Sequence, residues 1–230
     1  MIASKQIEAI AARAPLAKGY RFELLERTEI AAVIGLIATW FPDIRVGGAS
    51  GYLREAFYAE QVYFDDACSR NVIVQLLKQG DELAGVFTCE FDRDRLSVYG
   101  GIGVVTPRHR GANLAQAGIW FTETIGRRLG MGLAYGMATL KAPHAQRAFE
   151  RAGWRLVGMT PGYDRELVAP GVVKRVYEAV YAKVLVADAD LLHPERRNMT
   201  PDTRDFFERV FPDPPLAQPQ PRELHDAQAG

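Results

Sequence analysis

The chain has 230 residues, of which 48% are hydrophobic and 24% charged, a composition typical of a soluble globular protein with one sizeable core. Its 28 lysines and arginines are balanced by 28 aspartates and glutamates without a long basic run, so we expect no nucleic-acid partner. No apolar run reaches membrane length, and Cys68 and Cys89 lack the spacing of metal ligands. We therefore expect a cytoplasmic protein with reduced thiols, no membrane contact and no metal.

The N-terminal part of the chain predicts a helix, a strand and a second helix. Residues 2–14 place apolar side chains at helical spacing, whereas residues 20–24 alternate apolar and polar side chains as a strand does. Thr28 is the candidate N-cap of the next helix, which has to end at Pro42. Residues 44–51 contain three glycines and are expected to form a mobile loop.

A further helix and a three-stranded antiparallel meander follow. The helix opens at Leu53 and carries three aromatic side chains, Tyr58, Tyr63 and Phe64. Residues 71–78 and 83–91 are rich in apolar residues and are joined by a short turn, which predicts an antiparallel pair of strands. A charged turn at residues 92–95 leads into the third strand, which has to stop before Pro107 because proline has no N–H to donate.

The stretch after this turn combines a glycine-rich strand, a basic loop and an amphipathic helix. Interior glycines indicate a bulge or a close backbone approach, and here they are interleaved with Ile102, Val104 and Val105. The helix begins at Leu114 and presents one apolar face, formed by Leu114, Gly118, Phe121, Ile125 and Leu129. The unpaired N–H groups in the first turn of such a helix form an anion site at the end of the loop.

The last part of the domain alternates strands and one short helix. Residues 133–139 and 154–159 are predicted strands on either side of a helix with Pro143 at its first position. Residues 162–171 are expected to form a loop. Residues 175–186 predict a final strand, and apolar residues on both of its faces favour a central place in the sheet.

The predicted elements divide the chain into three parts. Residues 1–18 form an N-terminal helical extension, and residues 19–186 form one α/β domain. Residues 187–230 form a C-terminal extension with a short helix at residues 201–211. The segment that follows, residues 213–230, is proline-rich with few apolar residues and is expected to be disordered.

Two segments resemble signatures of the GNAT N-acetyltransferase superfamily. Residues 110–115, RGANLA, match the family's acyl-CoA pattern R/Q-x-x-G-x-G/A at their first and last positions, with Asn113 in place of the inner glycine. Residues 148–154, AFERAGW, are similar to the family's A/L-Y-x-K-x-G-F. With the order of elements over residues 19–186, the resemblance implies the GNAT fold. This is an α/β (α+β) domain with a mixed, mostly antiparallel central sheet, flanked by helices and splayed between its fourth and fifth strands.

In this family the backbone N–H groups of the loop hold the pyrophosphate of coenzyme A, and the preceding strand pairs with the pantetheine arm. The resemblance therefore implies acetyl-CoA as co-substrate and an N–H near Val104 as the oxyanion donor. Asn113 tolerates positive φ better than most non-glycine residues, so the loop is expected to keep its shape. The implied cofactor-binding residues are Ile102, Val104, Val105, Arg110, Gly111, Ala112, Asn113, Leu114, Ala115 and His144.

The catalytic positions depart from the pattern of the family. Tyr99 stands where many relatives have a glutamate base, and Phe149 stands where many have a tyrosine acid. Glu90 on the neighbouring strand is the nearest acidic candidate and is expected to lie near Ser97. We therefore predict Glu90 and Tyr99 as the catalytic residues. The alternatives are a solvated strand residue for Glu90 and a core or cleft-wall tyrosine for Tyr99.

Further residues have two interpretations each. An unpaired carboxylate is costly to bury, so Glu178 on the last strand is either paired or turned toward the cleft. His109 either meets the phosphates of CoA or is an ordinary loop residue. Three tyrosines either line the acceptor pocket or belong to the core: Tyr58, Tyr63 and Tyr163.

The resemblance implies an acyl-CoA-dependent N-acyltransferase, with transfer of acetyl to the amine of a small molecule by direct attack in a ternary complex. A protein amine is a second acceptor class. The departures at Tyr99 and Phe149 favour one alternative, a non-catalytic CoA-binding or sensing module. Another alternative is an acyltransferase with an acyl carrier protein as donor. Many members of the family are dimers, so a monomer and a homodimer both stay open.

Overall fold

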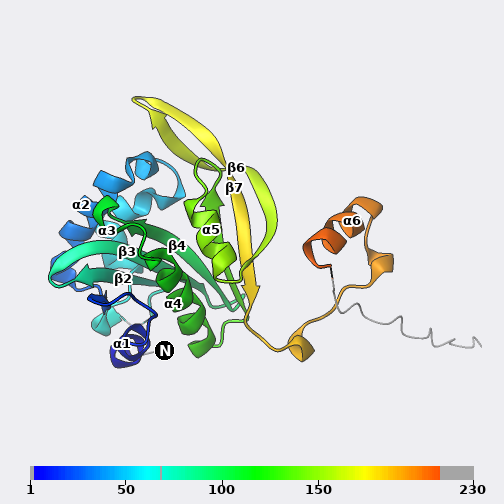
Figure 1. Cartoon of the computed structure of the whole chain (residues 1–230), viewed down its shortest axis with the longest axis horizontal. Coiled ribbons are helices and arrows are strands. Elements are labelled where there is room, and N and C mark those ends of the chain that lie inside the picture. Colours follow the sequence, from blue (N-terminus) through cyan, green and yellow to red (C-terminus); the bar gives the residue numbers. More distant parts are fainter. Residues whose placement is uncertain (1–2, 68, 213–230) are drawn as a thin grey trace, which may run out of the picture. The chain divides into compact units, whose positions relative to one another are not determined.

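The computed structural model describes residues 3–67 and 69–212 (Figure 1). The chain divides into two compact units, Met1–Val186 and Ala187–Gly230. Cys68 and the predicted proline-rich tail lie outside the described residues, whereas Cys89 is buried. None of the helices in the described ranges is both long and apolar enough to span a bilayer.

The first unit is built on one seven-stranded sheet with the strand order β1-β2-β3-β4-β5-β7-β6. Only the β4–β5 pair is parallel, so the predicted mixed, mostly antiparallel sheet is confirmed. The strands are β1 (Tyr20–Leu24), β2 (Val72–Gln79), β3 (Glu82–Asp92), β4 (Ser97–Val105), β5 (Leu133–Thr139), β6 (Arg155–Ala169) and β7 (Val172–Val184).

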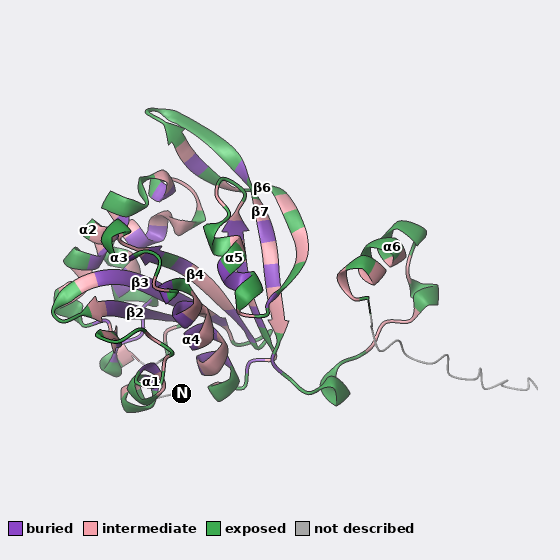
Figure 2. Ribbon diagram, viewed as in Figure 1, coloured by how far each residue is buried: buried purple, intermediate pink, exposed green. Residues whose placement is uncertain are grey.

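Helices cover both faces of this sheet, and each face has its own apolar core (Figure 2). One core joins the sheet to α1 (Ser4–Ala11), α4 (Leu114–Arg128) and α5 (His144–Arg151). The other core joins β2, β3 and β4 to α2 (Ile30–Trp40) and α3 (Glu55–Gln61). We call these the α4 face and the α2 face of the sheet.

Helix α4 lies against the sheet because two glycines remove side chains from its inner face. A Cβ atom on Gly118 would lie only 2.2 Å from Cδ1 of Phe87 on β3. A Cβ atom on Gly126 would lie 2.7 Å from Cγ1 of Val98 on β4. The loop before α4 is therefore held close to the ends of the central strands.

Alanine at Gly118 is expected to destabilise the fold by about 1–3 kcal/mol, because the added methyl group has to displace the buried ring of Phe87. Gly35, in the middle of α2, is a matched control because nothing lies within 4 Å of its Cβ position. Alanine at Gly35 is expected to stabilise the protein by up to about 1 kcal/mol through helix propensity. Urea unfolding of both variants checks this contrast, and equal effects would contradict the close packing.

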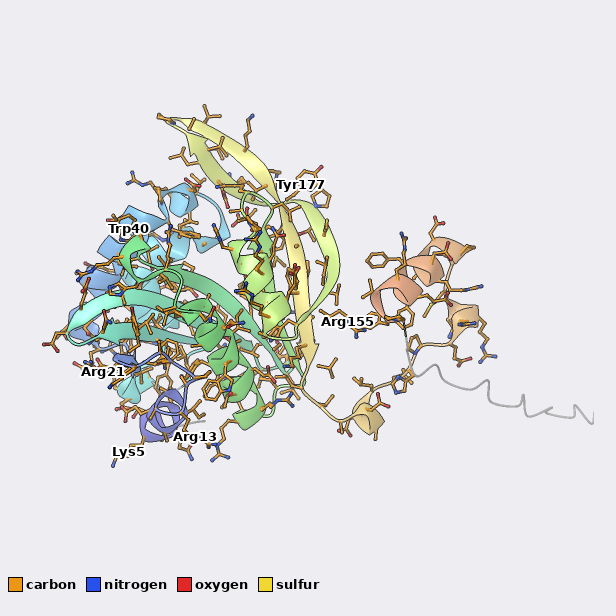
Figure 3. The ribbon with its side chains drawn as sticks, viewed as in Figure 1. Lys5, Arg13, Arg21, Trp40, Arg155 and Tyr177 are labelled. Atoms are coloured by element: carbon orange, nitrogen blue, oxygen red, sulfur yellow. The ribbon has the colours of Figure 1, made fainter. Side chains whose placement is uncertain are left out.

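The structure corrects the prediction for residues 162–171, which do not form a loop. Strand β6 continues to Ala169, and the chain turns at Gly171, which has a φ of +72°. Gly162, with a φ of +67°, lies in an irregular part of the β6–β7 pairing instead of in a loop. The resulting hairpin is seen in yellow in Figure 1, and Tyr177 projects from β7 with 59% of its surface exposed (Figure 3). Strand β7 is internal, as its apolar pattern predicts.

The segment between α2 and β2 also differs from its prediction. Most of residues 44–51 lie in two 3₁₀ helices, η2 (Pro42–Arg45) and η3 (Gly48–Leu53), which Val46 and Gly47 join. Helix α3 ends at Gln61, so it does not carry Tyr63 and Phe64. Thr28 is not the helix cap, because a 3₁₀ helix at Arg27–Glu29 precedes α2. Similarly, α5 begins at His144, one residue after the predicted Pro143.

In the second unit the described residues form two 3₁₀ turns and the helix α6 (Pro201–Val210). The helix has a proline at its first position and a capping hydroxyl at Thr200, which accepts a hydrogen bond from the Thr203 N–H at 3.3 Å. Arg196 forms a 3.0 Å ion pair with Glu208. The short helix predicted at residues 201–211 is present.

Candidate active site

The central feature of the site is an opening between the parallel strands β4 and β5. These strands pair only over Ser97–Gly100 and Leu133–Gly136, at their N-terminal ends. Beyond this point residues 101–105 have no partner on β5, and residues 137–139 pair with β7 alone. We call the space between these two segments the β4–β5 opening. The predicted splay between the fourth and fifth strands is confirmed, and it begins after Gly100 and Gly136.

A bulge in β4 produces this separation. Cys89 on β3 pairs with Gly100 and Phe87 pairs with Gly103, so Thr88 alone faces the two residues between them. Oγ1 of Thr88 accepts the N–H of Ile102 at 2.8 Å. A Cβ atom on Gly101 would lie only 2.6 Å from that oxygen. The interior glycine that the sequence singled out is therefore required by close packing at a bulge.

The hydrogen-bond ladder shows which backbone groups of β4 face the opening. The N–H groups of Ile102 and Thr106 both point to β3, the second at 2.9 Å from the carbonyl oxygen of Ala84. Because direction alternates along a strand, Val104 points to β3 as well. The N–H of Val104 itself therefore does not face the opening, and the neighbouring groups that point into it are those of Gly103 and Val105. The predicted oxyanion donor near Val104 stays a prediction, with Gly103 and Val105 as its candidates.

The loop after β4 presents a row of free backbone donors. Gly111 has a φ of +95°, and Asn113 adopts the left-handed conformation with a φ of +56°, as expected for a residue in place of glycine. No acceptor within the described residues takes the N–H groups of residues 111–115, and no side chain caps α4. Space around Gly111 is open, with nothing within 4 Å of a Cβ position. This donor set fits a diphosphate.

The side chains around this loop have different roles. Arg108 and Arg110 are exposed, and Nε of Arg110 donates to the carbonyl oxygen of Val105 at 3.2 Å. His109 is instead 3% exposed and is hydrogen-bonded through Nδ1 to the Tyr20 hydroxyl at 2.9 Å. His109 therefore anchors the loop to the sheet and does not face a phosphate. His144 is exposed at the start of α5, on the same edge of the sheet as the loop.

Glu90 and Tyr99 lie directly opposite each other on β3 and β4. The prediction that Glu90 faces Ser97 is wrong by two residues, because Ser97 pairs with Asp92. Oε1 of Glu90 accepts a 2.8 Å hydrogen bond from the hydroxyl of Tyr52, a residue of η3 that the sequence did not single out. Burial raises the pKa of the Glu90 carboxyl, and the hydrogen bond from Tyr52 opposes that shift.

Tyr99 belongs to the wall of the opening. Its ring lies 5.1 Å from that of Tyr135 on β5. Burial, followed by the charges of Glu178 and Glu90, raises the pKa of the Tyr99 hydroxyl. Tyr99 therefore holds its proton at neutral pH.

Glu178 is turned toward the open side of the sheet and is not paired. It lies on β7 opposite Thr139, on the same face as Tyr99 and Tyr135. Among the described residues no donor or cation bonds to its carboxylate. Burial raises the pKa of Glu178 to about 7, and the charges of Asp164 and Glu166 add to this effect.

The remaining aromatic candidates divide between core and surface. Tyr58 and Tyr63 are buried in the two cores, whereas Tyr163 on β6 is 52% exposed. Phe149 stacks on Tyr181 with the ring centroids 5.2 Å apart. The hydroxyl of Tyr181 donates to Glu150 at 2.9 Å and so does not replace the missing tyrosine acid.

No family model and no curated protein matches the sequence. Solved structures do match. Spermidine N-acetyltransferase from Vibrio cholerae is similar with a TM-score of 0.57 and 14% identity, over 74% of this chain and 95% of that one. The ribosomal L7/L12 alpha-N-protein acetyltransferase RimL, in complex with coenzyme A, is similar with a TM-score of 0.57 and 12% identity, over 77% and 99%. The chain therefore has the fold of the GNAT N-acetyltransferases, as its two sequence segments predicted.

Proposed function

We propose that the chain is an acetyl-CoA-dependent N-acetyltransferase that acts on the amine of a small molecule. The observation that carries this proposal is the β4–β5 opening, which ends at five consecutive N–H groups without acceptors. A slot with this shape suits a long thiol carrier with a diphosphate at one end. Structures of similar fold support it, since one is described with coenzyme A and another with CoA and spermine.

The residues of the chain supply the binding part of the reaction. The N–H groups of residues 111–115 would hold the diphosphate, and Arg108 and Arg110 lie beside them. The backbone groups of Gly103 and Val105 would pair with the pantetheine arm, which then lies in the opening as an added strand. His144, at the start of α5, stays a predicted contact of this arm. Acetyl-CoA would supply the thioester.

The transfer step would use groups on the α2 face of the opening. The amine attacks the thioester carbonyl carbon, and the N–H of Gly103 stabilises the negative charge on the carbonyl oxygen. Glu90 accepts the proton that the nitrogen loses, directly or through one water. The carbon–sulfur bond then breaks, and the thiolate takes up the proton of the Tyr99 hydroxyl. The proton that Glu90 took from the nitrogen restores this hydroxyl, since Glu90 lies opposite Tyr99. Tyr52 is a positioning residue, because its hydroxyl holds the Glu90 carboxylate.

This arrangement also bears on the two alternative functions, a non-catalytic CoA-sensing module and an acyltransferase with an acyl carrier protein as donor. A sensing module needs no base. In this structure Oε1 of Glu90 would lie 3.0 Å from a Cβ atom on Gly101, and the Tyr52 hydroxyl holds the same oxygen in place. A carrier-protein donor presents a single phosphate, whereas the loop offers donors for two. Both observations favour catalysis with CoA. The cytoplasmic location and the homodimer stay predictions.

Release of free thiol from acetyl-CoA tests the proposed function. The purified chain is incubated with acetyl-CoA and a panel of primary amines, and CoA binding is measured separately by calorimetry. We expect CoA to bind and at least one amine to release thiol above the rate of spontaneous hydrolysis. Binding without any release would favour the sensing module, and the absence of CoA binding would refute the proposal.

A further inference from the structure

We propose that Glu178 selects acceptors that carry a second positive charge in addition to the reacting amine. This inference rests on the proposed function and names the substrate class of the same site. Its basis is an unpaired carboxylate at a defined distance from the opening.

Glu178 lies on a part of the sheet that neither core covers. Ala134 and Ala138 of β5 and Ala179 of β7 point into the core of the α4 face. Because side chains alternate, the residues between them point to the other side, where the second core extends only over β2, β3 and β4. The exposed floor that results is lined by Tyr135, Met137, Thr139, Glu178 and Val180, all of them half-buried. An acceptor can approach the opening over this floor, away from α4 and its loop.

The register fixes how far Glu178 lies from the reacting atoms. Thr139 is three residues beyond the last paired residue of β5, and Gly103 is three residues beyond that of β4. Glu178 pairs with Thr139, so it lies near the level of Gly103, which the bulge shifts by one residue, but two strands away. Two regular strand spacings amount to about 10 Å, and the separation of β4 from β5 beyond Gly136 makes this a lower bound. Glu178 is therefore too far away to accept the proton of the attacking nitrogen, whereas Glu90 adjoins the bulge.

The other acidic side chains near this floor already have partners. Asp164 accepts the N–H groups of Gly48 at 2.9 Å and Arg165 at 2.7 Å. Glu166 and Asp43 share Lys141. Only Glu178, among these described acids, lacks a protein donor. A half-buried anion without a partner favours a ligand that brings a cation, and it disfavours one that brings a second carboxylate.

A diamine can place one nitrogen beside Glu90 and the other beside Glu178 at the same time. One nitrogen, deprotonated, reacts beside Glu90, and the other, still protonated, pairs with Glu178 at the far end of the floor. A monoamine of equal length leaves Glu178 unpaired. The site is therefore expected to discriminate among amines by the charge at the end opposite the reacting nitrogen.

Three amines of equal chain length test this inference: butane-1,4-diamine, n-butylamine and 4-aminobutanoate. We expect wild-type protein to have the highest kcat/KM for the diamine and the lowest for the carboxylate. Glu178→Gln is expected to lower kcat/KM for the diamine by about 10- to 100-fold, mainly through KM, and to change kcat/KM for n-butylamine far less. Glu60→Gln, an exposed acid on α3, controls for net charge and is expected to change none of the three.

Two outcomes would overturn the inference while the proposed function stands. An equal loss with all three amines would make Glu178 a general base or a structural residue. Unchanged discrimination would remove it from recognition. Calorimetric titration of the CoA-loaded protein with butane-1,4-diamine makes the same comparison without turnover. Weaker binding in Glu178→Gln supports the inference even where no transfer is detected, and equal binding refutes it.

Discussion

Glutamate in place of Gly111 is expected to weaken CoA binding by roughly 100-fold or more, because a charge set against the diphosphate costs several kcal/mol. Gly111 lies in the row of free N–H groups before α4, and none of the described residues lies within 4 Å of its Cβ position. The introduced carboxylate would therefore lie at the proposed phosphate site. Calorimetry with CoA measures the loss directly.

Gly130 provides a matched control at the other end of the same helix. It has a φ of +73° and open space around its Cβ position, so glutamate there meets the same kind of backbone strain as at Gly111. We expect Gly130→Glu to lower stability to a similar extent and to leave CoA affinity unchanged. Equal CoA affinity in the two variants would mean that the loop is not the phosphate site.

Replacement of Glu90 by glutamine is expected to lower turnover by roughly 100- to 10,000-fold, the range for loss of a general base, without a change in CoA affinity. The acceptor for this measurement is a monoamine, so that Glu178 does not contribute. Burial raises the pKa of Glu90, and only the ionised carboxylate can accept a proton. Turnover of the wild type is therefore expected to fall as the pH falls through this raised pKa, and the variant should lack that decrease.

Tyr52→Phe separates a positioning role from a structural one. The substitution removes the hydroxyl that donates to Glu90 and leaves the packing of the ring in place. Since this hydrogen bond holds the pKa of Glu90 down, the acid limb of the pH profile is expected to move to higher pH. A lower rate with an unmoved pH profile would assign Tyr52 to structure alone.

The Glu90→Gln variant has its own contradicting outcome: full turnover would remove Glu90 as the base.

The sequence predicted those elements whose pattern is local. Strands β1 and β5 have the predicted bounds, because each is a short stretch whose side chains alternate between the two faces of the sheet. The left-handed Asn113 followed from the tolerance of asparagine for positive φ, and the glycine at the bulge from the rule that interior glycines indicate a bulge or a close approach. The prediction for β6 is wrong because a glycine such as Gly162 locally indicates a loop, whereas the strand passes through it at an irregularity in its pairing with β7.

The arrangement of the site depends on contacts that no local pattern contains. The register of Glu90 was missed because Leu96, counted as a strand residue, lies in the turn with a φ of +50°. That residue shifts the pairing by two positions and places Glu90 against Tyr99. The bond from Tyr52 to Glu90 joins residues 38 positions apart, from a segment without periodicity. Only the folded chain brings these groups together.

The short helix η3 touches two parts of the site at its two ends. At one end Tyr52 holds Glu90, and at the other Gly48 donates to Asp164 on the β6–β7 hairpin. Gly47 has a φ of +86° and leaves no room for a side chain beside Asp164. The position of Glu90, the proposed base, and that of the β6–β7 hairpin therefore both depend on this one segment. Replacement of the β6–β7 hairpin by another sequence would therefore require matching changes in residues 47–52.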